Sequence, residues 1–458
     1  MRYATETVKR YSLRLSALIL IGLITVNLVP DTSARRAPVR PPSTVSQADN
    51  QTDTVLDWNA HAAHAIVGVA GMRPERGLIR LAMVHIAIYD AVNAIEGYPF
   101  QAYGVTPNVV SPASPEAATA AAAHDMLVAL FSGQQADLDA KYAASLATIS
   151  DGPDKTNGIS VGQQTASGIL ALRASDGRDA VGTYTPGSGP GAWMPTPPAF
   201  LPAAAPETAH VQPFALNSPS QFRAEPPPAL TSDTWARNYN EVKSLGAATG
   251  STRTPEQTDI GRFWSDQPIL QWNRAWRNIS IEHGLSLQDK ARFFAMLATA
   301  SVDAIIACWD SKFTYNFWRP VTAIRAGDTD GNSETAPDAN WIAQVTTPNH
   351  PEYPAAHGCF SGASTQTLKF FFGTDDFAFT IDSNIAGLTN PLRSYGSFSQ
   401  ALDEVSDARV YGGMHYRNST RKGRNIGKQV SHYVTTHCFL PSRGGQRLTA
   451  RQSGWRQR

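Results

Sequence analysis

Two cations seven residues apart open the first of three short segments whose side chains could do chemistry together. In residues 312–320 (KFTYNFWRP), Lys312 and Arg319 are separated by two helical turns. A helix here would project both cations from one face, and Pro320 would then end it. Two stacked cations with few acids beside them form a clamp for a multivalent anion. The plainer alternative is a solvated helix end, where cations suit the helix dipole.

The second segment, residues 350–358 (HPEYPAAHG), holds two histidines on either side of a turn bracketed by prolines. A helix is predicted to start just after it, at Ser361. The first turn of a helix exposes unpaired N–H groups and the positive end of the dipole, which together suit an oxyanion. His357 would be placed to exchange protons with that anion.

The third segment, residues 409–415 (RVYGGMH), carries Arg409 and His415. Six residues apart on an unbroken helix, they would face different ways, but the intervening Gly412-Gly413 pair would interrupt the helix and let them converge. A glycine pair often marks only a turn, and a lone histidine is more often structural than catalytic. Together, however, the three segments supply the cations, the histidines and the helix N-terminus that would hold phosphate or its isostere vanadate.

Helical periodicity dominates the elements that must position these segments. Apolar residues recur at spacings of three and four along residues 78–92, and Ser114-Pro115-Glu116 is a strong start for a helix to Phe131. Another helix is predicted for 160–174. Capping signals at Thr254 and Ser286 open two more, the second long and ending by Pro320. Strand patterns are scarce, so the sequence predicts an all-α helical bundle with long loops.

The segment from Tyr184 to Pro228 interrupts this pattern. It contains twelve of the chain's 31 prolines, together with Trp193, Phe200, Phe214 and Phe222. Proline at this density excludes helix interiors and central strands. The scattered aromatic residues predict a loop that packs onto the domain and not a free linker.

The N-terminal residues 1–34 are predicted to be a secretory signal peptide. A basic start precedes an apolar run from Leu15 to Val29, and Thr32-Ser33-Ala34 offers small residues for cleavage. The run is short for a membrane span, although an uncleaved anchor is the alternative. No later stretch is read as a transmembrane helix. We therefore expect a secreted or periplasmic protein.

Residues 35–54 are predicted to be a flexible linker and 441–458 a basic tail, and the length of the chain allows two or three average domains or one large one. Removing 1–34 takes away four basic and two acidic side chains, which changes the formal net charge from +1 to −1. A nearly neutral chain does not indicate nucleic-acid binding. Three cysteines are too few for a disulfide scaffold, and the pairing among Cys308, Cys359 and Cys438 is left open.

These segments resemble the superfamily that joins vanadium-dependent haloperoxidases with type 2 phosphatidic acid phosphatases. The family signature is Lys-x6-Arg-Pro, then Pro-Ser-Gly-His, then Ser-Arg-x5-His-x3-Asp. This chain has Lys312-x6-Arg319-Pro320, then 354–357 (PAAH), then Arg409-x5-His415. Residues 81–95 and Phe263-Trp264 also look like the haloperoxidase branch. The resemblance thus covers most of the chain and implies a single all-α domain at 55–440, with the chemistry-bearing core at about 287–440.

The resemblance implies how vanadate would be held. Lys312, Arg319 and Arg409 would bind its equatorial oxygens, with help from the backbone N–H of Ala356. His415 would bind the metal through a ring nitrogen.

The resemblance also implies roles in turnover. His357 would be the acid–base group, and Lys312 would polarise the bound peroxide before halide attacks it. His350 would lie on the halide side, where a histidine looks like the bromoperoxidase type and a carbocyclic aromatic residue like the chloroperoxidase type. Asp266 resembles an acid that pairs with Arg409, although its spacing is shifted by one residue.

Three positions depart from the family pattern. The signature serine is Ala355, so one hydroxyl donor to the oxyanion is missing, worth about 1.5–3 kcal/mol for a charged acceptor. The signature glycine is Ala356. The aspartate four residues after the last histidine is Ser419, so His415 is predicted to lack its orienting carboxylate.

The sequence therefore predicts a vanadate-dependent haloperoxidase-like enzyme that oxidises bromide or iodide with hydrogen peroxide, acting on halide or a small organic substrate. One alternative is an acid phosphatase in which His415 forms a phosphohistidine. Another is a non-catalytic envelope protein that binds phosphate or vanadate. A homodimer is compatible with the sequence.

Overall fold

Helix α9 (Leu287–Tyr315) is the longest element in the computed structural model, which describes residues 53–442. The side chain of Ser286 accepts the N–H of Asp289 at its start, as predicted. Residues 291–312 are buried without a break. The predicted signal peptide, nearly all of the predicted linker and most of the basic tail lie outside the described residues.

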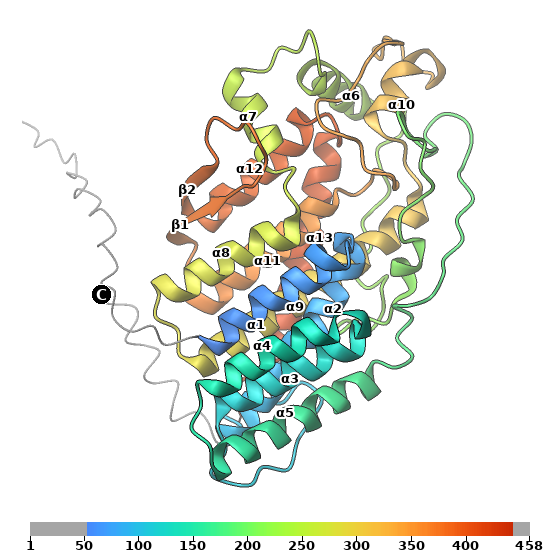
Figure 1. The fold of residues 1–458 in the computed structure, drawn as a ribbon. Helices are drawn as coiled ribbons and strands as arrows, with labels where there is room; N and C mark the ends of the chain where they lie inside the picture. Colours follow the sequence, from blue (N-terminus) through green and yellow to red (C-terminus); the bar gives the residue numbers. More distant parts are fainter. Residues whose placement is uncertain (1–52, 443–458) are drawn as a thin grey trace, which may run out of the picture. The chain divides into compact units, whose positions relative to one another are not determined.

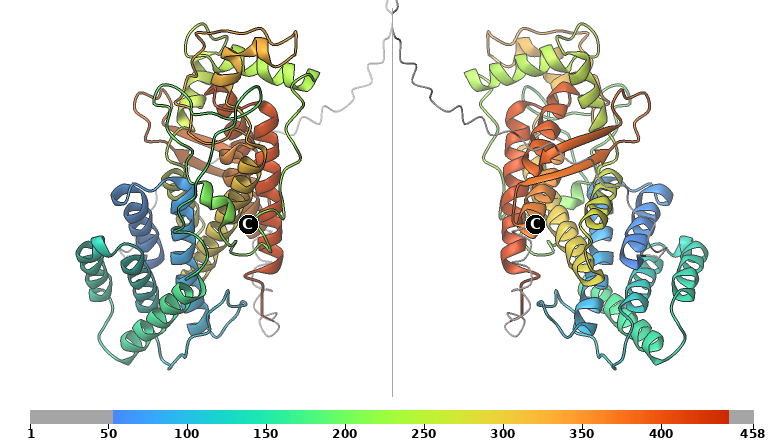
Figure 2. Two further views of the ribbon diagram at one scale, coloured as in Figure 1. Left: turned by 90° about the vertical axis from the view of Figure 1, so that its right-hand side faces the viewer. Right: turned by 90° about the vertical axis from the view of Figure 1, so that its left-hand side faces the viewer.

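Three long helices pack against α9: α2 (Pro74–Ile95), α11 (Ala356–Phe372) and α13 (Arg417–His437). In both views of Figure 2, α9 lies between the blue and teal N-terminal helices and the orange and red C-terminal helices. Both α2 and α9 are long and apolar enough to cross a bilayer, contrary to the reading of the sequence. Because the apolar windows of α2 and α9 are 94% and 100% buried within the protein, the two helices form its core.

The predicted all-α class is confirmed: 57% of the structure is helical and 5% is strand (Figure 1). The capping box at Thr254 is present. The helix predicted from residue 160 begins earlier, at Pro153, because proline fits the first helical position after Gly152. The other α-helices are α1 (Thr54–Ala63), α3 (Pro115–Leu130), α4 (Gln135–Ala147), α5 (Pro153–Leu172), α6 (Asp233–Gly246), α7 (Pro255–Phe263), α8 (Pro268–Glu282), α10 (Pro320–Arg325) and α12 (Phe398–Tyr411).

Shorter segments join these helices. A π-helical segment (His64–Val69) follows α1, and 3-10 turns are formed by Ser132–Gln134, Pro206–His210 and Gly327–Thr329. One antiparallel hairpin, β1 (Asp376–Asp382) and β2 (Leu392–Ser397), leads into α12. This hairpin was not predicted from the sequence.

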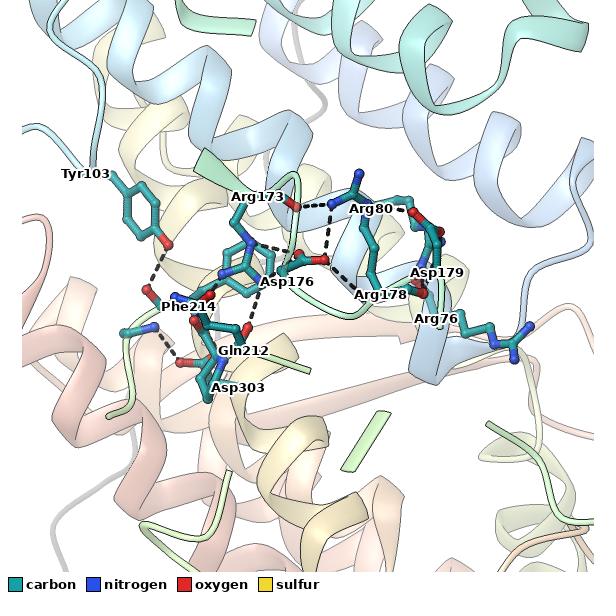
Figure 3. A network of polar contacts seen from close by, with 12 residues as sticks. Arg76, Arg80, Tyr103, Arg173, Asp176, Arg178, Asp179, Gln212, Phe214 and Asp303 are labelled. Carbon is teal, nitrogen blue, oxygen red and sulfur yellow. Dashed lines mark hydrogen bonds and ion pairs between the residues drawn. The ribbon is translucent and has the colours of Figure 1, made fainter. Parts of the chain in front are cut away.

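The proline-rich segment is fastened to the domain, as predicted. Asp303 on α9 accepts the backbone N–H groups of Phe214, Ala215 and Leu216 at 2.7, 2.7 and 3.0 Å. Arg173, at the end of α5, donates to two neighbouring backbone carbonyls, those of residues 212 and 213, at 2.6 and 3.0 Å. Figure 3 shows Arg173 and Asp303 meeting this stretch of backbone. Two buried side chains, Asp303 and Arg173, therefore hold the proline-rich segment, and the backbone of that segment supplies their hydrogen-bond partners.

Glycines allow α11 and α13 to cross closely. A Cβ atom on Gly423 would lie 2.4 Å from the carbonyl oxygen of Ala355, and one on Gly427 would lie 2.2 Å from that of Cys359. Both distances are far below a van der Waals contact, so only glycine permits this separation of the two backbones. The crossing sets the position of the start of α11 relative to α13.

We expect Gly427→Ala to lower the free energy of unfolding by about 3 kcal/mol, at the upper end of overpacking penalties, because backbone atoms cannot move aside as a side chain can. Denaturant titration measures this change. Gly133→Ala is the matched control, because a Cβ there has nothing within 4 Å, and it should change stability by less than about 1 kcal/mol. Equal stability of the two variants would contradict the close crossing.

Candidate oxyanion pocket

Two of the three chemistry-bearing segments, residues 350–358 and 409–415, line one cavity of about 160 Å³, and the first segment, residues 312–320, contacts them from behind its wall. Its wall combines the start of α2, one face of α9, the 348–360 segment and the end of α12 with the turn after it. The cavity is lined by Arg73, Pro74, Glu75, Leu78, Pro268, Ile305, Trp309, Pro348, His350, Ala356, His357, Phe360, Arg409 and His415. Five of the predicted site residues, His350, Ala356, His357, Arg409 and His415, are therefore brought together.

Positive charge accumulates at this cavity. Lys312, Arg319 and Arg409 are all buried, and among residues 53–442 none of them forms an ion pair with a carboxylate. Burial, which penalises the charged form, lowers the pKa of Lys312 to about 8, of Arg319 to about 10 and of Arg409 to about 9. All three stay mainly protonated at neutral pH. Glu352 is the buried carboxylate that acts on Lys312 and Arg319, and Glu75, also buried, lines the cavity. The three buried cations outnumber these two acids, so among the described residues the region carries an excess of positive charge that an anion would balance.

Lys312 lies behind the cavity wall and not on it. Its ammonium group donates to the carbonyl oxygens of Pro351, Glu352 and Pro354 at 2.8, 2.9 and 2.5 Å. These three bonds use all three of its protons, so binding an oxyanion oxygen would require one of them to be exchanged. Cys308 contacts the Pro354 carbonyl as well, at 3.7 Å, and is a free thiol like the other two cysteines.

Arg319 does not share a helix face with Lys312, and that prediction is wrong. Helix α9 ends at Tyr315, where Asn316 takes a left-handed conformation with φ 48°. Arg319 is extended at the start of α10, since Pro320 disfavours a helical conformation in the residue before it. Its guanidinium instead reaches across to the carbonyl of His350 (2.9 Å) and to Nε2 of His415 (3.2 Å). Arg319 thus joins the second and third segments from behind.

Helix α11 begins at Ala356, five residues before the predicted start at Ser361. Ala355 is extended and precedes the first turn, so His357 lies within that turn and beside its free N–H groups. The Nε2 atom of His357 has no hydrogen-bond partner in the described part of the chain. Burial, followed by the charges of Arg409 and the other cations, holds the pKa of His357 well below its usual range. The ring is therefore neutral at pH 7.

Arg409 and His415 converge through the glycine pair, as predicted. Helix α12 ends at Tyr411, and Gly413 adopts φ 75°, which reverses the chain before His415. The Arg409 guanidinium donates to the carbonyl of Trp264 at 2.9 Å, while its Nε has no partner among residues 53–442. A buried donor that lines a cavity and lacks a protein acceptor is available to a bound anion or to water.

Asp266 does not pair with Arg409, and that prediction is wrong. Its carboxylate forms an ion pair with Arg274 at 2.7 Å and accepts the N–H of Asn384 at 3.0 Å. Asp266 precedes α8 by two residues, and Arg274 lies within that helix, so the local turn directs the carboxylate toward α8 and the hairpin. Arg409 is left without an acidic partner within the described range.

The orienting carboxylate of His415 is present but comes from an unexpected position. Glu352 Oε1 accepts from His415 Nδ1 at 2.8 Å and from the Tyr416 N–H at 3.0 Å. Its Oε2 accepts from the Ser419 hydroxyl at 2.7 Å. The prediction that the Ser419 departure deprives His415 of a carboxylate is therefore wrong. Burial, the largest effect, raises the pKa of Glu352 to about 7, while Ser419 and the nearby cations oppose that shift.

His350 packs on Trp309, with ring centroids 5.0 Å apart, and its Nδ1 lies 3.0 Å from Arg319 Nη2. Trp309 and Ile305 were not predicted as site residues, although Ile305, Trp309 and Lys312 recur at helical spacing on α9 and could have been found in this way. The α2 residues of the cavity were not predicted as site residues either, and no local signal exists for them.

Comparison with known proteins agrees with this architecture. Residues 292–441 match the family described as the VCPO second helical-bundle domain. The vanadium chloroperoxidase of Curvularia inaequalis is 27% identical over 188 residues, which are 35% of this chain and 31% of the relative, so the match spans about a third of that protein's length.

Solved structures extend the likeness to most of the chain. A bacterial vanadium-dependent iodoperoxidase superposes with a TM-score of 0.72 at 24% identity, covering 87% of this chain and 99% of its own. The holo form of a bacterial vanadium-dependent chloroperoxidase gives 0.61 at 15% identity, covering 83% and 95%. The fold is that of the vanadium-dependent haloperoxidases. The resemblance predicted from the three segments is thereby confirmed.

Proposed function

We propose that the protein is a vanadate-dependent haloperoxidase that oxidises bromide or iodide with hydrogen peroxide to hypohalous acid. The observation that carries this proposal is Arg409, a buried guanidinium that lines the cavity without any acidic partner in the described residues and with an unbonded Nε. The comparisons support the proposal, because the relatives are named as vanadium haloperoxidases.

The residues present suit vanadate. Arg409 and the first-turn N–H groups of α11 would hold its oxygens, Arg319 and Lys312 would supply charge from behind, and His415 would offer its Nε2 as the ligand. When bound, vanadate activates hydrogen peroxide as a donor of electrophilic oxygen. The cavity residues exclude bulk water and fix the orientation of the anion.

His357 would handle the proton. Forming hypohalous acid and water from halide and peroxide consumes one proton, so the pocket needs a group that can take up a proton and release it. The neutral ring of His357 has a free Nε2, and a bound anion beside it would raise its pKa from its depressed value. Its rate contribution as a general acid–base group would be about 10²–10⁴-fold.

The halide preference rests on His350 and Trp309. Their rings border the cavity and offer polarisable surfaces to a large, weakly hydrated halide. The likeness in fold to an iodoperoxidase supports this preference. Because another relative is a chloroperoxidase, chloride is also to be tested as a substrate. We also propose export from the cytoplasm, which rests on residues 1–34 alone.

An acid phosphatase is the second candidate, and the contact between Glu352 and His415 favours it as much as it favours a haloperoxidase. A carboxylate on Nδ1 would leave the lone pair on Nε2, the atom that would attack phosphorus in place of its contact with Arg319. Phosphate and vanadate are isosteric, so the same pocket would serve either chemistry.

Parallel assays test these functions. Purified protein is incubated with vanadate, peroxide and iodide, bromide or chloride, and separately with a generic phosphomonoester without vanadate. Halogenation that is lost in His415→Ala supports the proposal. Release of phosphate without halogenation would make the protein a phosphatase, and inactivity in both assays together with measurable anion binding would make it a non-catalytic binder.

A further inference from the structure

Ser419 stands where the family signature has an aspartate, and the structure shows what surrounds it. Its hydroxyl donates to Glu352 Oε2 at 2.7 Å, and both residues are buried, with exposed fractions of 1% and 0%. Glu352 itself lies 67 positions earlier, in the turn before α11. A carboxylate has therefore reached the His415 ring from a different segment of the chain.

The hydrogen bonds around Glu352 define the protonation of His415. Oε1 accepts the Tyr416 N–H, so that oxygen is an acceptor, and the His415 Nδ1 atom 2.8 Å away must carry the proton. Arg319 then donates to Nε2 at 3.2 Å, which requires a lone pair there. Both neighbours thus select the tautomer in which Nε2 carries the lone pair, which accepts from Arg319 here and would be given to a bound anion in exchange for that contact.

Glu352 is held in place by more than its side chain. Its backbone carbonyl accepts from Lys312 at 2.9 Å, and the carbonyls of Pro351 and Pro354 accept from the same ammonium group. The side chain is then fixed by the Tyr416 N–H and the Ser419 hydroxyl. The carboxylate has little freedom to leave the ring, which is what a positioning residue requires.

We propose that Glu352 and Ser419 together replace the downstream aspartate of the family: Glu352 positions His415 for binding vanadate or phosphate, and Ser419 positions Glu352. This inference rests on the proposed function, because it assigns His415 as the residue that binds the anion. Under this proposal, Ser419 supports a carboxylate that comes from another segment of the chain, so His415 keeps a carboxylate partner.

The first test measures anion affinity by calorimetry, with vanadate and with inorganic phosphate as probes. Glu352→Ala should weaken vanadate binding by about 10–100-fold, the usual effect of removing the partner of a ligating histidine. Ser419→Ala should weaken it by only about two- to fivefold, because one hydrogen bond to a charged group is lost while the carboxylate remains. Glu352→Ala/Ser419→Asp should bind within about fivefold of the parent, because His415 and Ser419 both contact the Glu352 carboxylate and a carboxylate at 419 would enter the space that it leaves.

The second test reads the tautomer directly and needs no bound anion. In protein labelled with 15N-histidine, ring shifts assigned by comparison with His415→Gln should show a protonated Nδ1 in the parent and a mixture of tautomers in Glu352→Ala. Glu404→Gln is the control for general destabilisation, since Glu404 accepts from Trp264 and Tyr395 away from the cavity. It should lower the melting temperature without changing the His415 signals or the affinity.

The outcomes separate the two proposals. Unchanged affinity and an unchanged His415 tautomer in Glu352→Ala would overturn the positioning role, whatever the enzyme does. A double variant that folds but binds no better than Glu352→Ala would overturn the claim of replacement. A parent protein that binds neither vanadate nor phosphate would overturn the proposed function, while the tautomer measurement would still decide whether Glu352 orients His415.

Discussion

Replacing Arg409 with methionine is expected to abolish most of the anion affinity while leaving the fold nearly as stable as before. Arg409 has no carboxylate partner in the described part of the chain, so methionine removes an unbalanced buried charge and fills a similar volume. The loss of its bond to the Trp264 carbonyl costs about 1–3 kcal/mol, which the relief of desolvation offsets in part. We expect the free energy of unfolding to change by less than about 2 kcal/mol.

Vanadate and phosphate affinity should fall by at least about 100-fold in Arg409→Met, because two charge-assisted hydrogen bonds of about 1.5–3 kcal/mol each are lost. Calorimetry measures the affinity, and denaturant titration measures the stability. The matched control is Arg173→Met, which removes an equally buried arginine that pairs with Asp176 and should destabilise the protein by about 3–5 kcal/mol.

Arg409→Lys should keep part of the affinity, since the charge remains while the fork of donors is lost. If Arg409→Met bound vanadate as the parent does, the cavity would not be the anion site. If it unfolded as readily as Arg173→Met, the guanidinium would be a structural group and not a ligand-binding one.

Replacing His357 with alanine is expected to abolish most of the turnover while keeping most of the anion affinity. Its Nε2 has no partner among residues 53–442, so little structure depends on the ring. As the acid–base group it should contribute about 10²–10⁴-fold to the rate. Vanadate affinity should change by less than about tenfold, because the cations and His415 remain.

Steady-state halide oxidation and calorimetric binding on the same samples test this expectation. His124→Gln serves as the control, because His124 pairs with Asp125 and Asp139 and does not line the cavity, and it should keep the parent rate. A His357→Ala enzyme with more than about a tenth of the parent rate would be inconsistent with the 10²–10⁴-fold contribution of a general acid–base group. If both the vanadate affinity and the rate fell, His357 would be a residue that binds the anion.

The helical framework could be predicted because its signals are local. Capping residues at Ser114, Thr254 and Ser286 act within one turn, and the structure has helices at each. The β-hairpin was missed although Phe377, Phe379 and Ile381 alternate and are all buried in it. Seven residues of alternation are easily overlooked in a chain of helices, and only the pairing with β2 stabilises them.

The site was predictable where spacing along the chain determines contact and unpredictable where contact depends on the fold. Arg409 and His415 are joined by a short glycine turn, so their convergence could be anticipated. Glu352 and His415 are 63 residues apart, and the contact between them depends on the crossing of α11 with α13. The spacing of Asp266 along the chain likewise did not predict its partner, Arg274, because the start of α8 determines that contact.

The residues that line the cavity come from distant parts of the chain. Arg409 and the three histidines come from residues 350–415, whereas Arg73, Glu75 and Leu78 come from the start of α2, outside the region that matches the family model. The α2 side and the side with the anion-binding residues are thus separate parts of one pocket. Exchanging the start of α2 between relatives would change the lining that a halide or organic molecule meets, while every group proposed to hold the anion would stay in place.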